Sequence, residues 1–261
     1  MFDSGIGGLS VLRAVQQQLP GVRLTYIADS QHTPWGERGA AWVAARCQQL
    51  AGWLIDQGAS LVLVACNTGT TQAITTLRAR WPATPFVGVE PGIKPALAAS
   101  RNQRVAVLAT AGTLRSARLQ QLVHAHAGRA KVLQLPCPGL AEAIEAAGAD
   151  TDTGALQQQL DSVAAVLRAA DVDTVVLGCT HYPLVADALR QRLGQAVVLV
   201  DTADAVARRV ASLLGKAPGA AAARPGGLRL FSTADPAALQ AAARRWLGSA
   251  AAAQALVLHG P

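Results

Sequence analysis

Short apolar segments alternate with longer amphipathic segments along most of the chain. The short segments end in small or polar residues and predict buried strands over 24–28, 61–65, 86–89, 105–109, 132–135, 174–178 and 197–200. The longer segments repeat apolar residues at helical spacing and predict helices over 9–19, 40–57, 71–81, 114–126 and 155–169. Strands that alternate with helices are typical of an α/β fold with mostly parallel sheets flanked by helices.

Two halves of the chain carry a similar arrangement of loops and buried segments. In the first half, a loop beginning at Asp3 is followed by a buried segment that leads into Cys66. In the second half, a loop beginning at Thr110 is followed by a buried segment that leads into Cys179. Ligands of open α/β sheets bind beyond the carboxyl ends of the strands. We therefore predict two pseudo-symmetric domains, with the active site in the cleft between them.

The predicted domains are not both continuous in sequence. We assign residues 1–91 together with 205–261 to the first α/β domain, and residues 92–204 to the second. A strand over 228–231 and a helix over 236–247 are expected to return and complete the first domain. Segment 217–227 is rich in Ala, Gly and Pro, which predicts a flexible connection before that strand.

Composition and charge narrow the class of protein. The chain starts without the features of a signal peptide and contains no apolar run of the ~18 residues that a spanning helix needs, so we expect a soluble, cytoplasmic protein that does not bind membranes. The net charge of +7 suits either nucleic acid or an anionic substrate. Because the basic residues are mostly dispersed rather than clustered among aromatic ones, we expect no nucleic-acid partner.

The cysteines are the first candidates for chemistry. None of the four forms a C-x-x-C motif, which argues against a disulfide framework and structural zinc; Cys47 and Cys137 are expected to be structural. Cys66 lies where a strand leads into a helix, and a helix N-terminus lowers a thiol pKa and can hold a carboxylate. Taken by itself, Cys66 fits equally well as a small apolar residue. Cys179 repeats the arrangement and adds His181 within reach of proton exchange.

Two opposed thiols suit one class of reaction. Inversion of a chiral carbon needs a base on one face and an acid on the other, whereas a hydrolase needs a single nucleophile. Asp3 and Ser4 are expected near the same strand edge as Cys66, although both residue types also serve as ordinary helix caps. The glycines that follow, Gly5 to Gly8, do not fit a dinucleotide fingerprint, so no nucleotide cofactor is expected.

Four motifs carry a resemblance to a known family. They are DSGIGGL over 3–9, PWGE over 34–37, ACNT over 65–68 and GCTHYPL over 178–184, and the match continues to 231–235. With these motifs the chain resembles the glutamate racemases of the aspartate/glutamate racemase superfamily. Two positions depart from the family pattern: Trp35 stands where the family usually has Tyr, and only Met1 and Phe2 precede Asp3, which predicts a short first strand.

The resemblance implies a mechanism and a set of site residues. Cys66 would deprotonate D-glutamate and Cys179 would deprotonate L-glutamate, without pyridoxal phosphate, other cofactors or metal. Asp3 would assist Cys66, and His181 and Glu145 would assist Cys179. The residues implied to hold glutamate are Asp3, Ser4, Trp35, Gly36, Asn67, Thr68, Thr110, Thr113, Thr180 and His181. The product would be D-glutamate for peptidoglycan, and we expect a homodimer. Two alternatives remain. One is a racemase that acts on aspartate or a hydantoin, and the other is an inactive relative that binds a ligand or nucleic acid.

Overall fold

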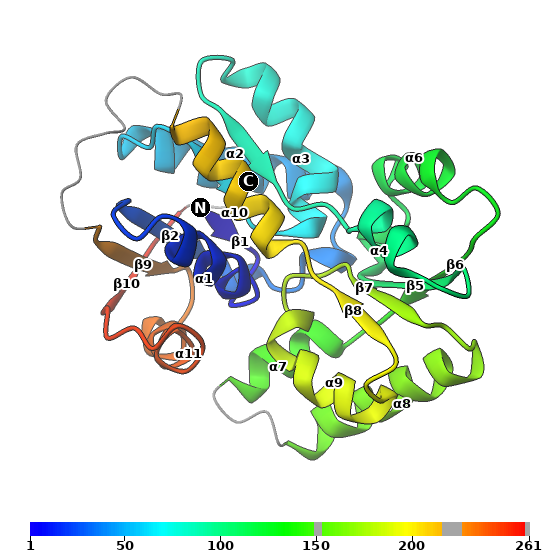
Figure 1. Cartoon of the computed structure of the whole chain (residues 1–261). Helices are drawn as coiled ribbons and strands as arrows, with labels where there is room; N and C mark the ends of the chain where they lie inside the picture. Colours follow the sequence, from blue (N-terminus) through cyan, green and yellow to red (C-terminus); the bar gives the residue numbers. More distant parts are fainter. Residues whose placement is uncertain (149–152, 216–225, 259–261) are drawn as a thin grey trace.

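The computed structural model describes residues 1–148, 153–215 and 226–258, which form two parallel β-sheets flanked by helices (Figure 1). The strands are β1 (Phe2–Asp3), β2 (Leu24–Ala28), β3 (Val62–Val64), β4 (Phe86–Gly88), β5 (Arg104–Ala109), β6 (Lys131–Pro136), β7 (Thr174–Leu177), β8 (Val198–Val200), β9 (Leu228–Ser232) and β10 (Ala253–Ala255). The α-helices are α1 (Leu9–Gln18), α2 (Ala40–Asp56), α3 (Asn67–Arg80), α4 (Ile93–Ala99), α5 (Ala111–Leu114), α6 (Ala117–His126), α7 (Leu140–Ala147), α8 (Gly154–Ala169), α9 (Ala186–Leu193), α10 (Ala203–Leu214) and α11 (Pro236–Leu247). The predicted fold class is confirmed.

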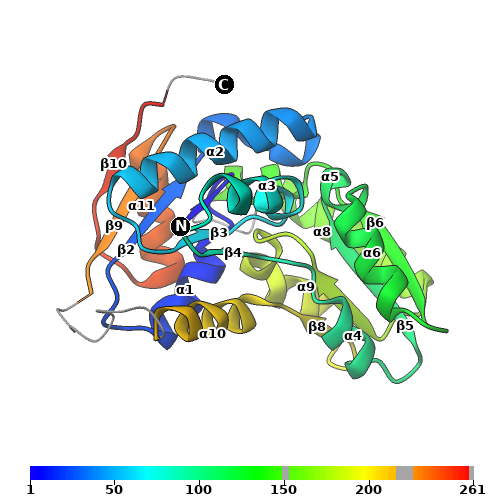
Figure 2. The same ribbon diagram turned by 90° about the horizontal axis from the view of Figure 1, so that it is seen from above.

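The first sheet has the strand order β10-β9-β2-β1-β3-β4, and its recorded strand pairs are all parallel. Helices α2 and α3 cover one face, and α1, α10 and α11 cover the other (Figure 2). Alternate residues of a strand point to opposite faces. Thus Val62 and Val64 pack with α2 and α3, whereas Leu63 packs in the cluster that contains α1.

The second sheet has the order β6-β5-β7-β8 and is also parallel. Its strands alternate in the same way: Val105 and Val107 pack against α4 and α6, while Ala106 and Leu108 face α7, α8 and α9. Burial on both faces of the inner strands β5 and β7 explains why these two strands read as nearly continuous apolar runs rather than as alternating patterns.

The two sheets share a common arrangement of strands. In the first sheet the strand that starts the half, β1, lies between β2 and β3, with β4 outside β3; in the second, β5 lies between β6 and β7, with β8 outside β7. The repeat recognised in the sequence is therefore present in the strand order. The first sheet is extended by β9 and β10, and the pairing of β9 with β2 confirms the predicted return of segment 228–231.

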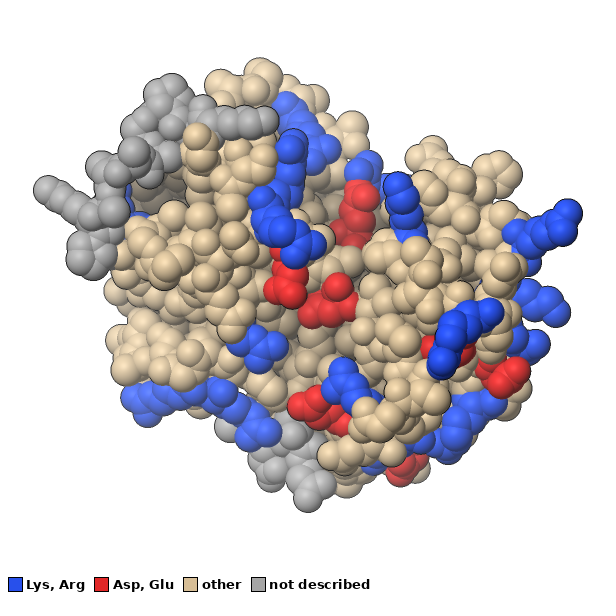
Figure 3. Space-filling view, viewed as in Figure 1, with Lys and Arg blue, Asp and Glu red and all other residues tan. Residues whose placement is uncertain are grey.

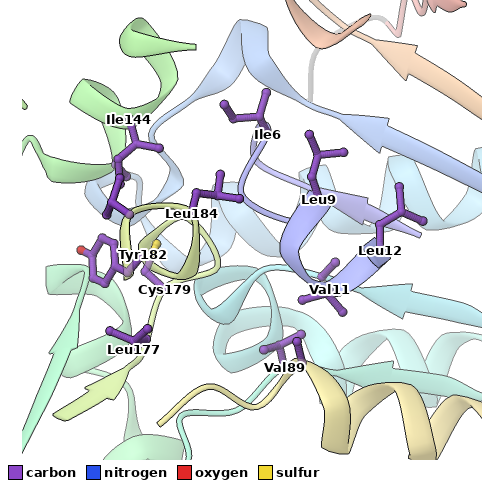
Figure 4. Close-up of a cluster of buried hydrophobic side chains, with 14 of the residues drawn as sticks. Ile6, Leu9, Val11, Leu12, Val89, Ile144, Leu177, Cys179, Tyr182 and Leu184 are labelled. Atoms are coloured by element: carbon purple, nitrogen blue, oxygen red, sulfur yellow. The ribbon is translucent and has the colours of Figure 1, made fainter. Parts of the chain in front are cut away.

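Buried side chains of both halves meet in one hydrophobic cluster. Figure 4 shows Ile6 and Leu9 of the first half beside Ile144, Tyr182 and Leu184 of the second. This continuous packing holds the ends of β1, β3, β5 and β7 near one another. It therefore fixes the region in which the predicted site residues lie.

Most predicted elements are found, with one correction and two points left open. The helix predicted over 114–126 is found as α6 but begins later than predicted: the chain forms α5, turns at Arg115, and starts α6 after Ser116, whose hydroxyl accepts a hydrogen bond from the Leu119 amide. The connection predicted over 217–227 lies mostly outside the described residues. The domain boundaries at 91/92 and 204/205 stay a prediction. Among the described residues, no helix is both long and apolar enough to cross a membrane.

Candidate active site

Cys66 lies at the junction between a central strand and a helix of the first half. It follows β3 with extended backbone angles and forms the N-cap of α3, where its Sγ accepts a hydrogen bond from the Gly69 amide at 3.4 Å. The Ser4 hydroxyl lies 3.9 Å from the same sulfur. The first amides of a helix carry partial positive charge, so this position can stabilise negative charge on the sulfur or on a ligand beside it.

Asp3 ends the neighbouring strand β1 and is fully buried. One carboxylate oxygen accepts a hydrogen bond from the Ser4 amide at 2.7 Å. The other accepts from the Gly8 amide at 2.5 Å and from the Thr180 hydroxyl of the second half at 3.1 Å. The N-cap of α1 is Gly8 rather than Asp3 or Ser4, so Asp3 is not an ordinary helix cap.

Burial and mutual charge raise the pKa values of this pair. Burial raises the pKa of Asp3 above 3.8, although the nearby His181 opposes that shift. Burial raises the pKa of Cys66 well above 9.0; the charges of Asp3 and Cys179 add to the effect, and the hydrogen bond from Gly69 opposes it. In the closed site Cys66 is therefore favoured as a neutral thiol, and it is close enough to Cys179 to respond to its charge.

Cys179 occupies the equivalent position in the second half, after β7. Its Sγ lies 3.6 Å from Nδ1 of His181, and Nε2 of that ring lies 2.6 Å from Oε1 of Glu145 on α7. Cys66 and Cys179 are 5% and 6% exposed, respectively. The arrangement is a relay in which a carboxylate orients an imidazole and the imidazole faces a sulfur.

The pKa of His181 is governed by opposing effects. Burial alone lowers it, but hydrogen bonds to Cys179 and Glu145, together with the negative charges of those groups, raise it well above 6.5. His181 is therefore favoured as an imidazolium. A positive charge at this distance can attract negative charge that develops beside it, on a ligand for example.

Two glycines allow the relay to approach the first half. A Cβ on Gly5 would lie 1.8 Å from Oε1 of Glu145, and a Cβ on Gly7 would lie 2.4 Å from Nδ1 of His181. Glu145 also accepts a hydrogen bond from the Ile6 amide at 2.5 Å. The absence of side chains at Gly5 and Gly7 thus leaves room for Glu145 and His181.

Threonine hydroxyls connect the two halves on another side of the site. Thr68 Oγ1, in the first turn of α3, lies 2.9 Å from Thr110 Oγ1 and 3.2 Å from Thr113 Oγ1. Thr110 follows β5 and caps α5; because β5 is the equivalent of β1, Thr110 lies at the same strand end in the second half as Asp3 does in the first. These hydroxyls, with that of Thr180, are the groups in the cluster that can turn to bind a ligand.

Asn67, Gly36 and Trp35 differ in what they offer to a ligand. Asn67 donates from Nδ2 to the Val89 carbonyl at 3.1 Å, while its buried Oδ1 finds no donor among the described residues. Gly36 lies against Thr110. Trp35 is buried against Phe2, and its indole N–H donates to Asp29. The structure thus directs the one polar atom of the Trp35 side chain to Asp29.

A buried ion pair near this region was missed in the sequence analysis. Asp29, directly after β2, pairs with Arg46 of α2, and both side chains are fully buried. The available signal was the helical spacing: Arg46 shares the buried face of α2 with Val43, Cys47 and Leu50. A charged residue on an apolar face predicts a buried partner.

The remaining surface offers other features that do not include the predicted site residues. A cavity of about 410 Å³ is lined by residues such as Arg78, Glu90, Arg118 and Arg209. On the face seen in Figure 3, basic side chains are scattered, and acidic ones lie near its centre and toward its lower right. Across the described ranges, no group of three or more His, Cys, Asp or Glu side chains is placed to hold a metal ion.

Comparison with known proteins gives consistent matches. Residues 8–210 match the family described as Asp/Glu/Hydantoin racemase. A glutamate racemase of Ralstonia nicotianae is 44% identical over 254 residues, covering 97% of this chain and 91% of the relative. One from Pseudomonas putida is 43% identical over 240 residues, covering 92% and 90%. The fold is similar to that of Escherichia coli glutamate racemase, solved with L-glutamate and the activator UDP-MurNAc-ala, with a TM-score of 0.86, 33% identity and coverage of 99% and 97%.

Proposed function

Because the chain belongs to the Asp/Glu/Hydantoin racemase family and is therefore an amino-acid racemase, we propose that it interconverts L- and D-glutamate by a two-base mechanism. The bases are Cys66 and Cys179. Glutamate is proposed because the curated relatives that cover most of the chain are named for this substrate.

One observation carries the two-base proposal. Two buried thiols follow equivalent strands, β3 and β7, in two halves that have the same strand order. Each thiol also has its own titratable partner, a carboxylate in one half and an imidazole in the other. A single-nucleophile mechanism gives no reason for the second thiol to be built in this way.

The proton transfers balance without an additional reactant. In the direction from L- to D-glutamate, the Cys179 thiolate takes the α-proton and becomes a thiol, while the electron pair remains on the α-carbon as a carbanion. The Cys66 thiol then gives its proton to the opposite face and becomes a thiolate. The reverse direction exchanges the roles of the two sulfurs.

The partners of each sulfur support these roles. His181, held by Glu145, stabilises the Cys179 thiolate that starts the reaction from L-glutamate. Asp3 keeps Cys66 protonated until its proton is needed, and the Gly69 amide stabilises the thiolate that remains afterwards. Electrostatic groups fixed in advance in this manner lower the cost of charge that develops during reaction.

The groups proposed to hold glutamate follow from hydrogen-bonding chemistry. The unpaired Oδ1 of Asn67 is an acceptor and suits the α-ammonium group. The hydroxyls of Ser4, Thr68, Thr110, Thr113 and Thr180 can donate to the carboxylates, with the helix amides behind Asn67 and Thr68 adding positive potential. Gly36 supplies a close backbone wall. His181 and Asp3 border the same space, and Trp35 supports it from the core.

Substrate entry requires movement of the two halves. Both sulfurs are buried, and direct contacts such as Asp3–Thr180 and Ile6–Glu145 close the space between the halves. We propose that these contacts open for binding and re-form around the substrate. Re-closure excludes water, which strengthens the electrostatic stabilisation of the carbanion.

Cellular context completes the proposal. We propose that the enzyme acts as a cytoplasmic homodimer and that its D-glutamate serves peptidoglycan synthesis. Size-exclusion chromatography with light scattering tests the dimer; a monomer at catalytic concentrations would remove that part of the proposal and leave the chemistry untouched.

An assay in heavy water tests substrate and mechanism together. We expect circular dichroism of an L-glutamate solution to decay to zero, and proton NMR to show deuterium at the α-carbon of the D-glutamate formed. L-aspartate and a hydantoin serve as parallel substrates. Exchange with aspartate and none with glutamate would overturn the substrate. Binding of DNA that weakens with salt, without turnover of any of these compounds, would favour a binding protein instead.

A further inference from the structure

A fully buried carboxylate organises the segment that follows β2. Asp29 accepts hydrogen bonds from Arg46 Nε at 3.0 Å and Nη2 at 2.7 Å, from Trp35 Nε1 at 3.2 Å and from Thr233 Oγ1 at 3.0 Å, and it pairs with His32 Nδ1 at 3.1 Å. The partners come from α2, from the segment after β9 and from the segment after β2 itself. One carboxylate therefore ties three parts of the chain together.

Stability alone does not account for this ion pair. Removing two charges from water carries a large penalty, and a well-packed apolar pair is often as stable or more stable. What a bidentate guanidinium adds is a fixed geometry, since its planar fork holds both carboxylate oxygens in defined places. The question is then what this geometry holds in place.

Segment 29–38 contacts both sides of the proposed racemisation site. On the first half, the Thr33 hydroxyl donates to the carbonyl of Ser4, the residue that lies beside Cys66. On the second half, Gly36 lies so close to Thr110 that a Cβ on Gly36 would be 2.5 Å from the Thr110 Cβ. A Cβ on Gly112 would in turn be 2.8 Å from the Gly36 carbonyl oxygen.

We propose that the Asp29–Arg46 pair is a positioning device that holds segment 29–38 against both halves, so that Ser4 and Thr110 keep the spacing that substrate binding needs. This inference rests on the proposed function. Neither Asp29 nor Arg46 touches substrate: they act through Thr33 on Ser4, and through Trp35 and Gly36 on Thr110. The Trp35 indole serves this network as an anchor.

Variants of Arg46 separate positioning from general stability. Arg46→Met removes both hydrogen bonds to Asp29 while keeping a long apolar stem, and Arg46→Lys keeps the charge without the fork. The matched control is Leu54→Ala, which removes a buried side chain from the same face of α2, two helical turns beyond Arg46. The measurements are kcat and KM for glutamate, thermal unfolding, and amide hydrogen exchange over 35–38.

We expect Arg46→Met to raise KM about tenfold with a smaller change in kcat, because a misplacement of about 1 Å between binding groups is costly. Amide exchange over 35–38 should become faster, and Arg46→Lys should recover part of both effects. Leu54→Ala should lower the melting temperature but leave KM and the exchange of this segment near wild type.

The inference is overturned if Arg46→Met lowers the melting temperature while KM and exchange over 35–38 stay at wild-type values. Should Arg46→Met fail to fold, Thr233→Val removes one donor to Asp29, together with the acceptor of the Gln31 amide in the same segment, and is held to the same criteria. If the wild-type enzyme does not racemise glutamate, the proposed function fails, whereas faster exchange in the Arg46 variants still supports the role of the pair in holding the segment.

Discussion

The two halves of the site place a sulfur at the end of equivalent strands but surround it with opposite chemistry. Cys66 faces an acid, Asp3, and a helix N-terminus. Cys179 faces the imidazole ring of His181, which is backed by Glu145. The two sulfurs thus hold equivalent places in the fold, but the residues beside them differ: burial and the charge of Asp3 favour a neutral thiol at Cys66, whereas Cys179 lies next to the imidazole ring of His181.

The different surroundings of the two sulfurs make the two sides of the site unequal, but they cannot favour one enantiomer at equilibrium. In the proposed mechanism, L-glutamate meets a protonated Cys66 and gives its α-proton to Cys179. However, mirror-image amino acids have equal free energies, so kcat/KM must be the same in both directions at equilibrium. The asymmetry can therefore make kcat and KM differ between the enantiomers. Any variant that lowers kcat/KM must lower it by the same factor for both enantiomers.

The largest effect is expected from removing either sulfur. Cys66→Ser and Cys179→Ser should each lower racemisation by about 1,000-fold, because a serine hydroxyl is too weakly acidic to take over proton transfer. In heavy water, Cys66→Ser should still exchange the α-proton of L-glutamate faster than it inverts it, and Cys179→Ser should do the same for D-glutamate. Cys137→Ala, a buried cysteine outside the proposed machinery, is the control. Near-normal racemisation in either serine variant would end the two-base mechanism.

A smaller loss of activity is expected when a side chain added to the glycine-rich loop of the first half clashes with His181 of the second half. In Gly7→Ala the new Cβ would lie 2.4 Å from His181 Nδ1, so the ring must move away from Cys179. We expect a loss of about 100-fold in kcat/KM, measured by circular dichroism. Gly39→Ala, where a Cβ meets open space, should be near wild type. Equal activities of the two alanine variants would show that the contact with His181 has no catalytic consequence.

Neutralising the carboxylate behind the imidazole should have a milder effect. Glu145→Gln keeps an acceptor for His181 and Ile6 but removes the negative charge that helps to raise the pKa of His181. The imidazolium then loses its proton at lower pH, so the alkaline limb of the pH–kcat/KM profile should shift to lower pH, with about a tenfold loss at the optimum. Glu142→Gln on the same helix is the control. If the alkaline limb of Glu145→Gln does not shift, Glu145 does not control the protonation of His181 during catalysis.

The smallest effect concerns stability and belongs to the Cys66 side. Since the folded-state pKa of Asp3 is raised above 3.8, its protonated form contributes stability that is complete below pH 3.8 and is lost as the pH rises through the raised pKa. Asn does not titrate, so the melting temperature of Asp3→Asn relative to that of wild type should rise as the pH increases from 3.8 through the raised pKa. A gain of a few degrees is expected, since about 1 kcal/mol corresponds to roughly 2–4 °C in a chain of this size. A difference that is independent of pH would contradict the shift.

The sequence was sufficient for the fold because local and long-range patterns agree in this chain. Buried strands such as 105–109 and 174–178 are continuous apolar runs, and the recurrence of a cysteine after such runs revealed the repeat. The break between α5 and α6 escaped prediction because Arg115 and Ser116 continue the polar face of an amphipathic pattern. The extended backbone of Ser116 separates α5 from α6, and its capping hydrogen bond with the Leu119 amide marks the start of α6.

The site was only partly accessible from sequence. Motifs named Cys66, Cys179 and His181, and the structure brings them close together with Asp3 and Glu145; their catalytic roles stay predictions. The Asp29–Arg46 pair joins the residue after β2 to α2: helical spacing signals that Arg46 is buried, but it does not identify the partner. Trp35 stands where the family usually has Tyr, and that substitution does not indicate that the indole N–H donates to Asp29.

The pairing of β9 with β2 has a consequence for how the protein is made. Strands β5 to β8 follow one another without interruption, so the second sheet can assemble on the nascent chain as soon as β8 has left the ribosome. The first sheet must wait for residues 228–255 before β9 covers the outer edge of β2. An uncovered strand edge can pair with other chains. The half that is synthesised first is thus the last to be completed. A truncated messenger RNA that ends before β9 would release a chain in which the edge of β2 is unpaired and prone to aggregation.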